Sequence, residues 1–520
     1  MTSLTGIIKA DYLQRARSYS FLITLLASVC FAYTFLPTAQ DGYSTVRVGE
    51  FVGQNNTAWV GHVTAIMAST FLWLIGFYLV NNGIKRDIET GVGQIIATTS
   101  ISNFKYLLAK ALSNFLVLLT IVVIIMLMSI SLVLIRGSEY SFNLPQFLLP
   151  YFLCTIPSIF FVSALAVLSE VIFGKYSILQ NISFFILFCI LVANVNANVN
   201  TNRNWLDIIG TKELTDGIAN VVNARYTDAI RAASVGFDFG GLDKKKFFLF
   251  EGTNWSTGYI YLRLFWTGIA FLLIYFASKL FHRFDIGERR FIRKQKQIYV
   301  EALRQNDKKE IQLSGLPLAQ PALGILPIFK TEFLLLIRKG PKWFWAINAA
   351  GFIALFFIPI QLAHQFGLPL LWFLQINRWS DIATKEKYYN THYFTYASYQ
   401  PLQRLFTSQI LAAVLMAVIL SLPVLFRYII ASDLSSLISI LCGAFFVVGF
   451  SVCSGVITGG KRFFEIVYFM LVYLNLSSLP FADYFGALNH SVNYNQILAS
   501  VVTVLFLTAY MVRNYEVRNQ

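Results

Sequence analysis

The sequence predicts an all-α polytopic membrane protein of about twelve transmembrane helices, arranged as two parallel repeats of six. Of its 520 residues, 56% are hydrophobic and only 13% are charged, whereas soluble globular chains are about a quarter charged. Lipid must therefore cover much of the folded chain. The apolar residues also form continuous runs near the length of about 20 residues that crosses a bilayer as a helix, and they do not alternate as barrel strands do.

Six candidate spans lie in each half of the chain. In the first half they are 19–36, 59–82, 107–135, 148–173, 177–193 and 257–280. In the second half they are 343–361, 366–377, 405–430, 433–457, 463–480 and 497–513. The run 366–377 is short for a span, and without its crossing every later connection would change sides. The repeat described below favours a crossing.

Lysine and arginine in the short connections orient these spans, because such residues concentrate on the cytoplasmic side. With both termini in the cytoplasm, that side collects the basic residues of 83–106 and 378–404, while 481–496 holds none. The net charge of +15 then reflects topology in a plasma membrane, namely the bacterial inner membrane. Acids are mixed with the bases of the linker 281–325, which argues against a nucleic-acid partner.

This topology divides the chain into a first transmembrane half (1–280), a basic cytoplasmic linker (281–325) and a second transmembrane half (326–520). The first half carries an outer segment, 198–256, that is long enough to fold outside the bilayer. Four aromatic residues are candidates to form a small lid there: Trp205, Phe237, Phe239 and Trp255. The alternative is a connector that lies along the bilayer surface.

Matching stretches precede the first and the seventh span. Residues 7–13 and 328–334 share two apolar residues, a lysine, an acid two positions later, an aromatic residue and a leucine. Each predicts an amphipathic helix on the inner membrane surface. Short basic turns at 174–175 and 459–462 also join the fourth and fifth spans of each half. Together these features predict a parallel duplication, with a transport pathway between the halves.

The connection 83–106 carries the most specific local pattern. An acid-x-glycine element, Glu89 to Gly91, leads into a short apolar helix, a turn rich in serine and threonine, and the basic sequence 105–110 at the start of the next span. This pattern resembles the link between the second and third helices in permease subunits of type-2 ATP-binding-cassette (ABC) exporters. The proline that this family usually has near residues 100–101 is missing here.

A degenerate copy of the pattern lies in 378–404. Asp381 and Thr384 align with Asp87 and Thr90, and Arg404 aligns with Lys105, but the glycine is absent and tyrosines enrich the loop. The resemblance implies that both stretches dock on cytoplasmic ATPases. Such contacts need small residues for close approach, apolar anchors and charges that fix register. The implied coupling residues are Asp87, Glu89, Gly91, Gln94, Ile95, Ile96, Lys105, Asp381, Thr384, Glu386, Tyr388 and Arg404.

The resemblance also implies that two ABC ATPase subunits, as identical or different chains, carry the ATP and Mg²⁺. The sequence has no GxxxxGK[ST] phosphate-binding loop, no catalytic constellation and no metal-ligand spacing, so this chain is not expected to be an enzyme. An ion-coupled secondary transporter is one alternative. It is disfavoured because acids are scarce within the spans, and Glu170 is expected near a cytoplasmic span end, within reach of water. A second alternative is a membrane subunit that transmits ATP-driven motion to a periplasmic partner.

Polar and aromatic residues within the spans are candidates to line the pathway, with helix packing as the alternative role. They are Trp73, Phe77, Asn181, Phe185, Trp372, Gln375, Tyr473 and Asn475. The sequence does not identify the substrate.

Overall fold

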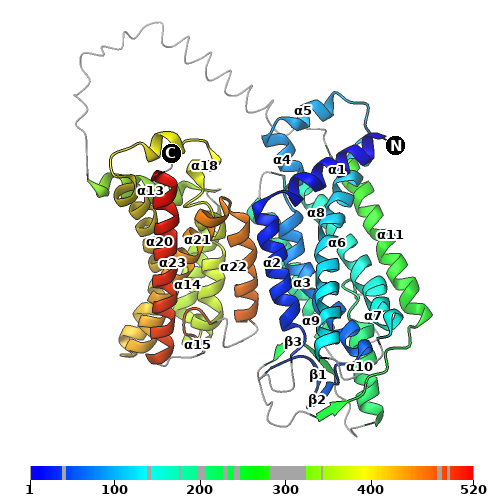
Figure 1. Cartoon of the computed structure of the whole chain (residues 1–520). Helices are drawn as coiled ribbons and strands as arrows, with labels where there is room; N and C mark the ends of the chain where they lie inside the picture. Colours follow the sequence, from blue (N-terminus) through cyan, green and yellow to red (C-terminus); the bar gives the residue numbers. More distant parts are fainter. Residues whose placement is uncertain are drawn as a thin grey trace. The chain divides into compact units, whose positions relative to one another are not determined.

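The computed structural model forms two compact units, Met1–Pro321 and Ala322–Gln520 (Figure 1). The residues that it describes are 2–37, 43–136, 142–174, 177–196, 207–225, 232–238, 246–281, 324–340, 343–476, 483–488 and 492–518. Most of the predicted linker 281–325 and part of the outer segment, with Trp205 and Phe239, lie outside the described residues. Each unit is considered by itself below.

Seven helices among the described residues are long and apolar enough to cross a membrane. They are Thr57–Glu89, Asn103–Arg136, Leu144–Phe173, Thr257–Leu280, Leu402–Ile430, Leu434–Thr458 and Tyr494–Arg518. The chain is therefore a largely helical membrane protein. At the other five predicted spans the apolar helices are shorter or interrupted, so the total of twelve spans stays a prediction.

The helices of unit 1 surround a central helix, α3. In chain order they are α1 (Thr2–Ala16), α2 (Tyr19–Thr34), α3 (Thr57–Val80), α4 (Gly83–Glu89), α5 (Val92–Ala97), α6 (Asn103–Arg136), α7 (Leu144–Pro150), the π-turn η1 (Tyr151–Thr155), α8 (Ile156–Phe173), α9 (Ser177–Asn196), α10 (Lys212–Arg225) and α11 (Thr257–Leu280). Helix α6 packs against α1, α2, α3 and α8, and α8 packs against α11. In the most apolar 18-residue stretch of the helix Thr57–Glu89, 89% of the residues are buried, against 22% in that of α11, so most of the α11 surface is exposed.

A four-stranded sheet closes the end of unit 1 opposite α1, α4 and α5 (Figure 1). Its strands are β1 (Ser44–Val48), β2 (Phe51–Gly53), β3 (Ala233–Asp238) and β4 (Lys246–Phe248), in the order β3-β1-β2-β4. Strand β1 pairs antiparallel with β2 and β3, and β2 pairs parallel with β4. The outer segment thus folds together with the loop that follows α2, an addition to the helical fold that the sequence did not predict.

The described residues of unit 2 form helices and turns, with no strand. In chain order these elements are α13 (Ile325–Arg338), α14 (Phe344–Phe357), α15 (Ile360–Leu362), the π-turn η5 (Ala363–Gly367), α16 (Leu368–Phe373), α17 (Ile376–Trp379), α18 (Lys385–Tyr388), α19 (His392–Tyr396), the π-turn η6 (Leu402–Phe406), α20 (Thr407–Ile430), α21 (Leu434–Thr458), α22 (Arg462–Leu476) and α23 (Val492–Arg518). Helix α20 packs against α13, α14, α16 and α21, and α21 packs against α23.

The predicted boundary between spans 343–361 and 366–377 is wrong. Helix α14 ends at Phe357 and the next helix starts at Ile360, because Pro359 has no N–H to continue a helix. The predicted gap lies within η5. There His364 is buried, and its ring nitrogens lie 2.9 Å from the Tyr428 hydroxyl and 3.1 Å from the Phe485 carbonyl. The polar ring of His364 is thus hydrogen-bonded inside the helical stretch.

Candidate coupling surfaces

The short helices α4 and α5 of unit 1 meet at a tight turn. Gly91 precedes α5 with φ of 74°, in the left-handed region that residues other than glycine enter at a cost. A Cβ atom at Gly91 would meet no other atom within 4 Å. Within this chain, the glycine is therefore required by the backbone turn and not by close packing.

The start of α4 is held by a carboxylate from α8. The two oxygens of Glu170 accept hydrogen bonds from the backbone N–H groups of Gly83 (2.9 Å) and Ile84 (2.7 Å), which are among the N–H groups that a helix start leaves without internal partners. Glu170 is only 8% exposed, so the expectation that water reaches it is wrong. Arg15 of α1 donates nearby to the Val80 carbonyl at 3.2 Å.

A buried lysine joins α1, α4 and α6. The Nζ atom of Lys110, in α6, lies 2.7 Å from carboxylate oxygens of both Asp11 in α1 and Asp87 in α4. The Tyr106 hydroxyl donates a second hydrogen bond to Asp87 at 2.7 Å. Lys110 is 3% exposed, and breaking a buried pair of this kind by removing one partner typically costs about 3–5 kcal/mol. Helix α4 is therefore fixed to three long helices, counting α8.

The structure separates the predicted coupling residues of unit 1 into exposed and buried groups. Glu89, Gln94, Ile95 and Lys105 are exposed, with Ile95 at 68%, while Gly91 and Ile96 are half-buried. Asp87 is buried and its carboxylate is used inside the chain. The surface left for a partner consists of the exposed sides of α4 and α5.

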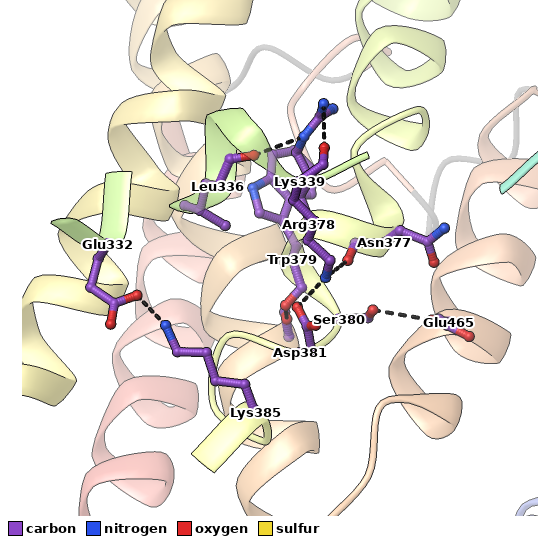
Figure 2. Close-up of polar contacts among 11 residues, drawn as sticks. Glu332, Leu336, Lys339, Asn377, Arg378, Trp379, Ser380, Asp381, Lys385 and Glu465 are labelled. Carbon is purple, nitrogen blue, oxygen red and sulfur yellow. Dashed lines mark hydrogen bonds and ion pairs between the residues drawn. The ribbon is translucent and has the colours of Figure 1, made fainter. Parts of the chain in front are cut away.

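In unit 2 the amphipathic helix α13 holds the stretch 378–404 through two lysines (Figure 2). Glu332 of α13 pairs with Lys385 at the start of α18. Lys339, which follows α13, pairs with Asp381 at 2.5 Å and donates to the Asn377 carbonyl. Burial lowers the pKa of Lys339, and the neighbouring carboxylate of Asp381 partly opposes that shift.

Arg378 caps the end of α13. Its Nε donates to the Leu336 carbonyl and its Nη2 to the Lys339 carbonyl, each at 3.0 Å, so it satisfies carbonyls that a helix end leaves open. Its Nη1 donates to the Gln375 side chain at 2.5 Å. Burial lowers the pKa of Arg378 to about 10. Close by, Ser380 donates to Glu465 of α22 at 3.0 Å.

Helices α20 and α23 hold the other side of α18. Glu386 is buried and accepts a hydrogen bond from Gln409 of α20 at 2.5 Å. Lys387 pairs with Glu516 of α23 at 2.5 Å, and Arg513 of α23 donates to the Ala383 carbonyl. The stretch is therefore tied to α13, α20, α22 and α23.

Most predicted coupling residues of unit 2 are covered. Thr384 and Glu386 are buried, Asp381 and Arg404 are half-buried, and Tyr388 is 59% exposed. The exposed side of this stretch is aromatic instead. Its large exposed residues are Tyr388, Tyr389, Tyr393, Phe394 and Tyr399.

The sequence pattern does not identify Lys110, Glu332 or Arg378 as site residues. Lys110 belongs to the basic sequence 105–110, and a lysine inside an apolar run is itself a signal of a buried partner. For Glu332 the signal was the acid shared by 7–13 and 328–334. Nothing local indicated that Arg378 caps another helix.

The candidate pathway residues of unit 1 lie in packed interfaces between helices. Trp73 is fully buried and its indole N–H donates to Ser158 at 2.6 Å. The Phe77 ring stacks on Phe184 with centroids 3.6 Å apart. Asn181 and Phe185 are also buried, and the Asn181 side chain accepts a hydrogen bond from Asn81.

The candidates of unit 2 are similarly placed. The Trp372 indole donates to the Ala417 carbonyl at 3.2 Å, and Gln375 bonds the side chain of Arg378. Asn475 is fully buried and Tyr473 is half-buried. In this structure most of these residues contribute to packing within their own unit.

Comparison with known proteins gives no match: no family model, no curated protein and no solved structure is significantly similar to this chain. Among the described residues, no group of three or more histidine, cysteine or acidic side chains is placed to hold a metal ion. Function is therefore inferred from the sequence pattern and the contacts above.

Proposed function

We propose that this chain is the permease subunit of an ABC exporter and forms the translocation pathway for ATPase subunits carried on other chains. The observation that carries the proposal is the anchoring of α4. Asp87 and the α4 N-terminus are bonded to Lys110 and Glu170, while Glu89, Gln94 and Ile95 stay exposed. A partner that moves this surface displaces α1, α6 and α8 together. ATP and Mg²⁺ bind to the partner in this proposal.

Two similarities between the units support a duplicated permease. The packing of α1 and α2 on α6 corresponds to that of α13 and α14 on α20, and the α8–α11 pair corresponds to α21–α23. In each unit the acid of the amphipathic helix pairs with a lysine, Asp11 with Lys110 and Glu332 with Lys385. In this proposal each half offers one surface to an ATPase, and the chain has twelve spans with both termini in the cytoplasm.

Ion-coupled transport is a weaker candidate. A carrier of this kind needs ionisable groups within the membrane that exchange their ions. Glu170 and Lys110, the ionisable residues of α8 and the adjoining part of α6, are each held by two fixed contacts. Their bonding supports an anchoring role.

A second candidate function is transmission of motion to a partner on the far side of the membrane. It is favoured by hydrogen bonds that attach segments of 198–256, which also supplies two strands of the sheet, to α3 and α11. Arg263 of α11 is buried and donates to the carbonyls of Asp207 and Ile208, and Tyr259 donates to Gly210 at 2.9 Å. His62 of α3 lies 2.9 Å from the Thr253 hydroxyl. A movement of α3 or α11 would therefore also move the residues next to the sheet at this end of unit 1.

The proposal is tested by purifying the tagged chain in mild detergent, with mass spectrometry and an ATPase assay on the eluate. We expect ATPase subunits with the wild type, and their loss with Ile95→Glu and Glu89→Lys. The matched control is Glu251→Lys, an exposed glutamate three residues after strand β4. A wild-type chain that purifies without an ATPase refutes the proposal and favours ion-coupled transport. That alternative is then measured as ion-dependent flux in vesicles.

A further inference from the structure

An apolar cavity of about 300 Å³ lies in unit 1 between the sheet and the helices. The ends of α2 and α6, the start of α3 and the strands β1, β2 and β4 form its walls. The main apolar lining residues are Phe35, Leu36, Val46, Val52, Trp59 and Phe247. This volume is at the lower end of the range of ligand pockets, about 300–1,000 Å³. It is about twice that of an engineered apolar cavity that stays dry and binds benzene.

The cavity wall is held open by rigid packing. The ring of Trp59 lies directly against β2, since a Cβ atom at Gly53 would be 2.3 Å from its Cδ2. Phe248 and Phe250 pack edge-on against the same indole, with centroids 5.6 and 5.9 Å away. Trp59 is 3% exposed. Its ring therefore has no room to turn and fill the cavity.

The described lining residues include one cation and no acid. Arg136 is the sole charged side chain among the described lining residues, and no ion pair joins it to a described residue. Its guanidinium donates to the Leu36 carbonyl at 3.1 Å and to the Tyr33 hydroxyl, and it lies over the Tyr33 ring at 4.4 Å. An arginine has five N–H donors, so donors remain for a ligand.

The position of Arg136 along α6 places the cavity near a lipid headgroup layer. Residues 111–135, between Lys110 and Arg136, contain no charged side chain. At about 1.5 Å per residue, the two cations are roughly 39 Å apart. That separation is close to the bilayer thickness of about 40–45 Å including headgroups. Next to Arg136, Leu134 and Ile135 are 73% and 79% exposed, as expected of a lipid-facing surface.

We propose that this cavity binds one acyl chain of an anionic single-chain amphiphile taken from the membrane, with the carboxylate on Arg136. The acyl chain fits the apolar walls, and a cation with no ion pair to a described residue fits the anionic head. Because benzene occupies half the volume, the space accepts about a dozen carbons, which is one chain and not two. This inference does not depend on the proposed function.

The test uses the full chain in detergent and radiolabelled dodecanoate, which is counted after the protein is separated from free probe. Wild type binds the probe saturably. Val46→Phe and Val52→Trp each add a ring to the lining and lower the affinity at least about tenfold. Arg136→Gln lowers it about tenfold, as expected for loss of a charge-assisted hydrogen bond, but leaves the affinity for uncharged radiolabelled dodecanol unchanged.

The control Leu149→Trp changes a second cavity, lined by α7 and the stretch after β4, and binds like wild type. Thermal unfolding checks that each variant is folded. If one filling variant fails to fold, the other decides, and if both fail, Arg136→Gln with the two probes decides. The same amount of retained probe with all variants and with empty micelles shows partition into detergent and overturns the proposal. Equal weakening of both probes by Arg136→Gln overturns the role of its charge.

Discussion

Removing the Lys110 charge tests whether α1, α4 and α6 form one mechanical element. In Lys110→Met the carboxylates of Asp11 and Asp87 lose their shared cation. Both lie 2.7 Å from the same nitrogen, so their oxygens are separated by no more than twice that distance. At about 5 Å and an effective dielectric constant of about 20, two anions repel by roughly 3 kcal/mol. We therefore expect Lys110→Met to lower the free energy of unfolding by about 3–5 kcal/mol.

The assay is chemical denaturation of the purified chain in detergent, followed as a double-mutant cycle. Adding Asp87→Asn to Lys110→Met removes one uncompensated anion, so the double variant should regain about 1–3 kcal/mol. Lys85→Met is the matched control, because the side chains of Lys85 and Glu89 are 39% and 43% exposed and lie 4.0 Å apart, and such pairs contribute at most about 1 kcal/mol. A Lys110→Met variant within about 1 kcal/mol of wild type, or strictly additive single changes, refutes the reasoning.

Two further predictions concern single positions. Gly91→Ala should destabilise the α4–α5 turn by about 1–2 kcal/mol, because φ is 74° there, and limited proteolysis should show faster cleavage at this turn. Gly258→Ala in α11, which has equal space and no positive φ, should have little effect, and equal sensitivity of both variants would contradict the strain argument. Burial raises the pKa of Glu386, so its favourable contribution is complete below the unfolded pKa of about 4.3 and is lost as pH rises through the folded pKa. Glu386→Gln should therefore be at least as stable as wild type at pH about 7, with the difference shrinking toward pH about 4 in urea titrations; a variant that loses stability at neutral pH would contradict this.

The sequence located the seven long helices well because each is a continuous apolar run, and α20 and α21 match the predicted spans 405–430 and 433–457 within a few residues. The sheet was not predictable in the same way. Strand β2 has three residues and β4 has three, and β1 finds its second partner in a loop far along the chain. Such short strands carry no periodicity of their own.

The candidate surfaces were predicted in part. The pattern in 83–106 placed Glu89 and Ile95 on an exposed stretch, but it could not show that Asp87 faces inward. That orientation is decided by Lys110, which lies on a different helix. The same holds in unit 2, where Lys385 meets Glu332 only through tertiary packing. Local pattern identifies the segment, whereas the fold decides which of its side chains remain available.

The order of the strands in the sheet has a consequence for synthesis of the chain. Strands β1 and β2 emerge early and pair with each other, yet β3 and β4 lie on their two outer edges. Residues 54–232 must be made before β3 appears, which takes roughly 10–40 s at typical translation rates. During that interval both hairpin edges stay open, and a free edge invites pairing with other chains. Unit 1 therefore completes this end only after β4 has been synthesised, and a ribosome that stalls earlier leaves an aggregation-prone intermediate for quality control to remove.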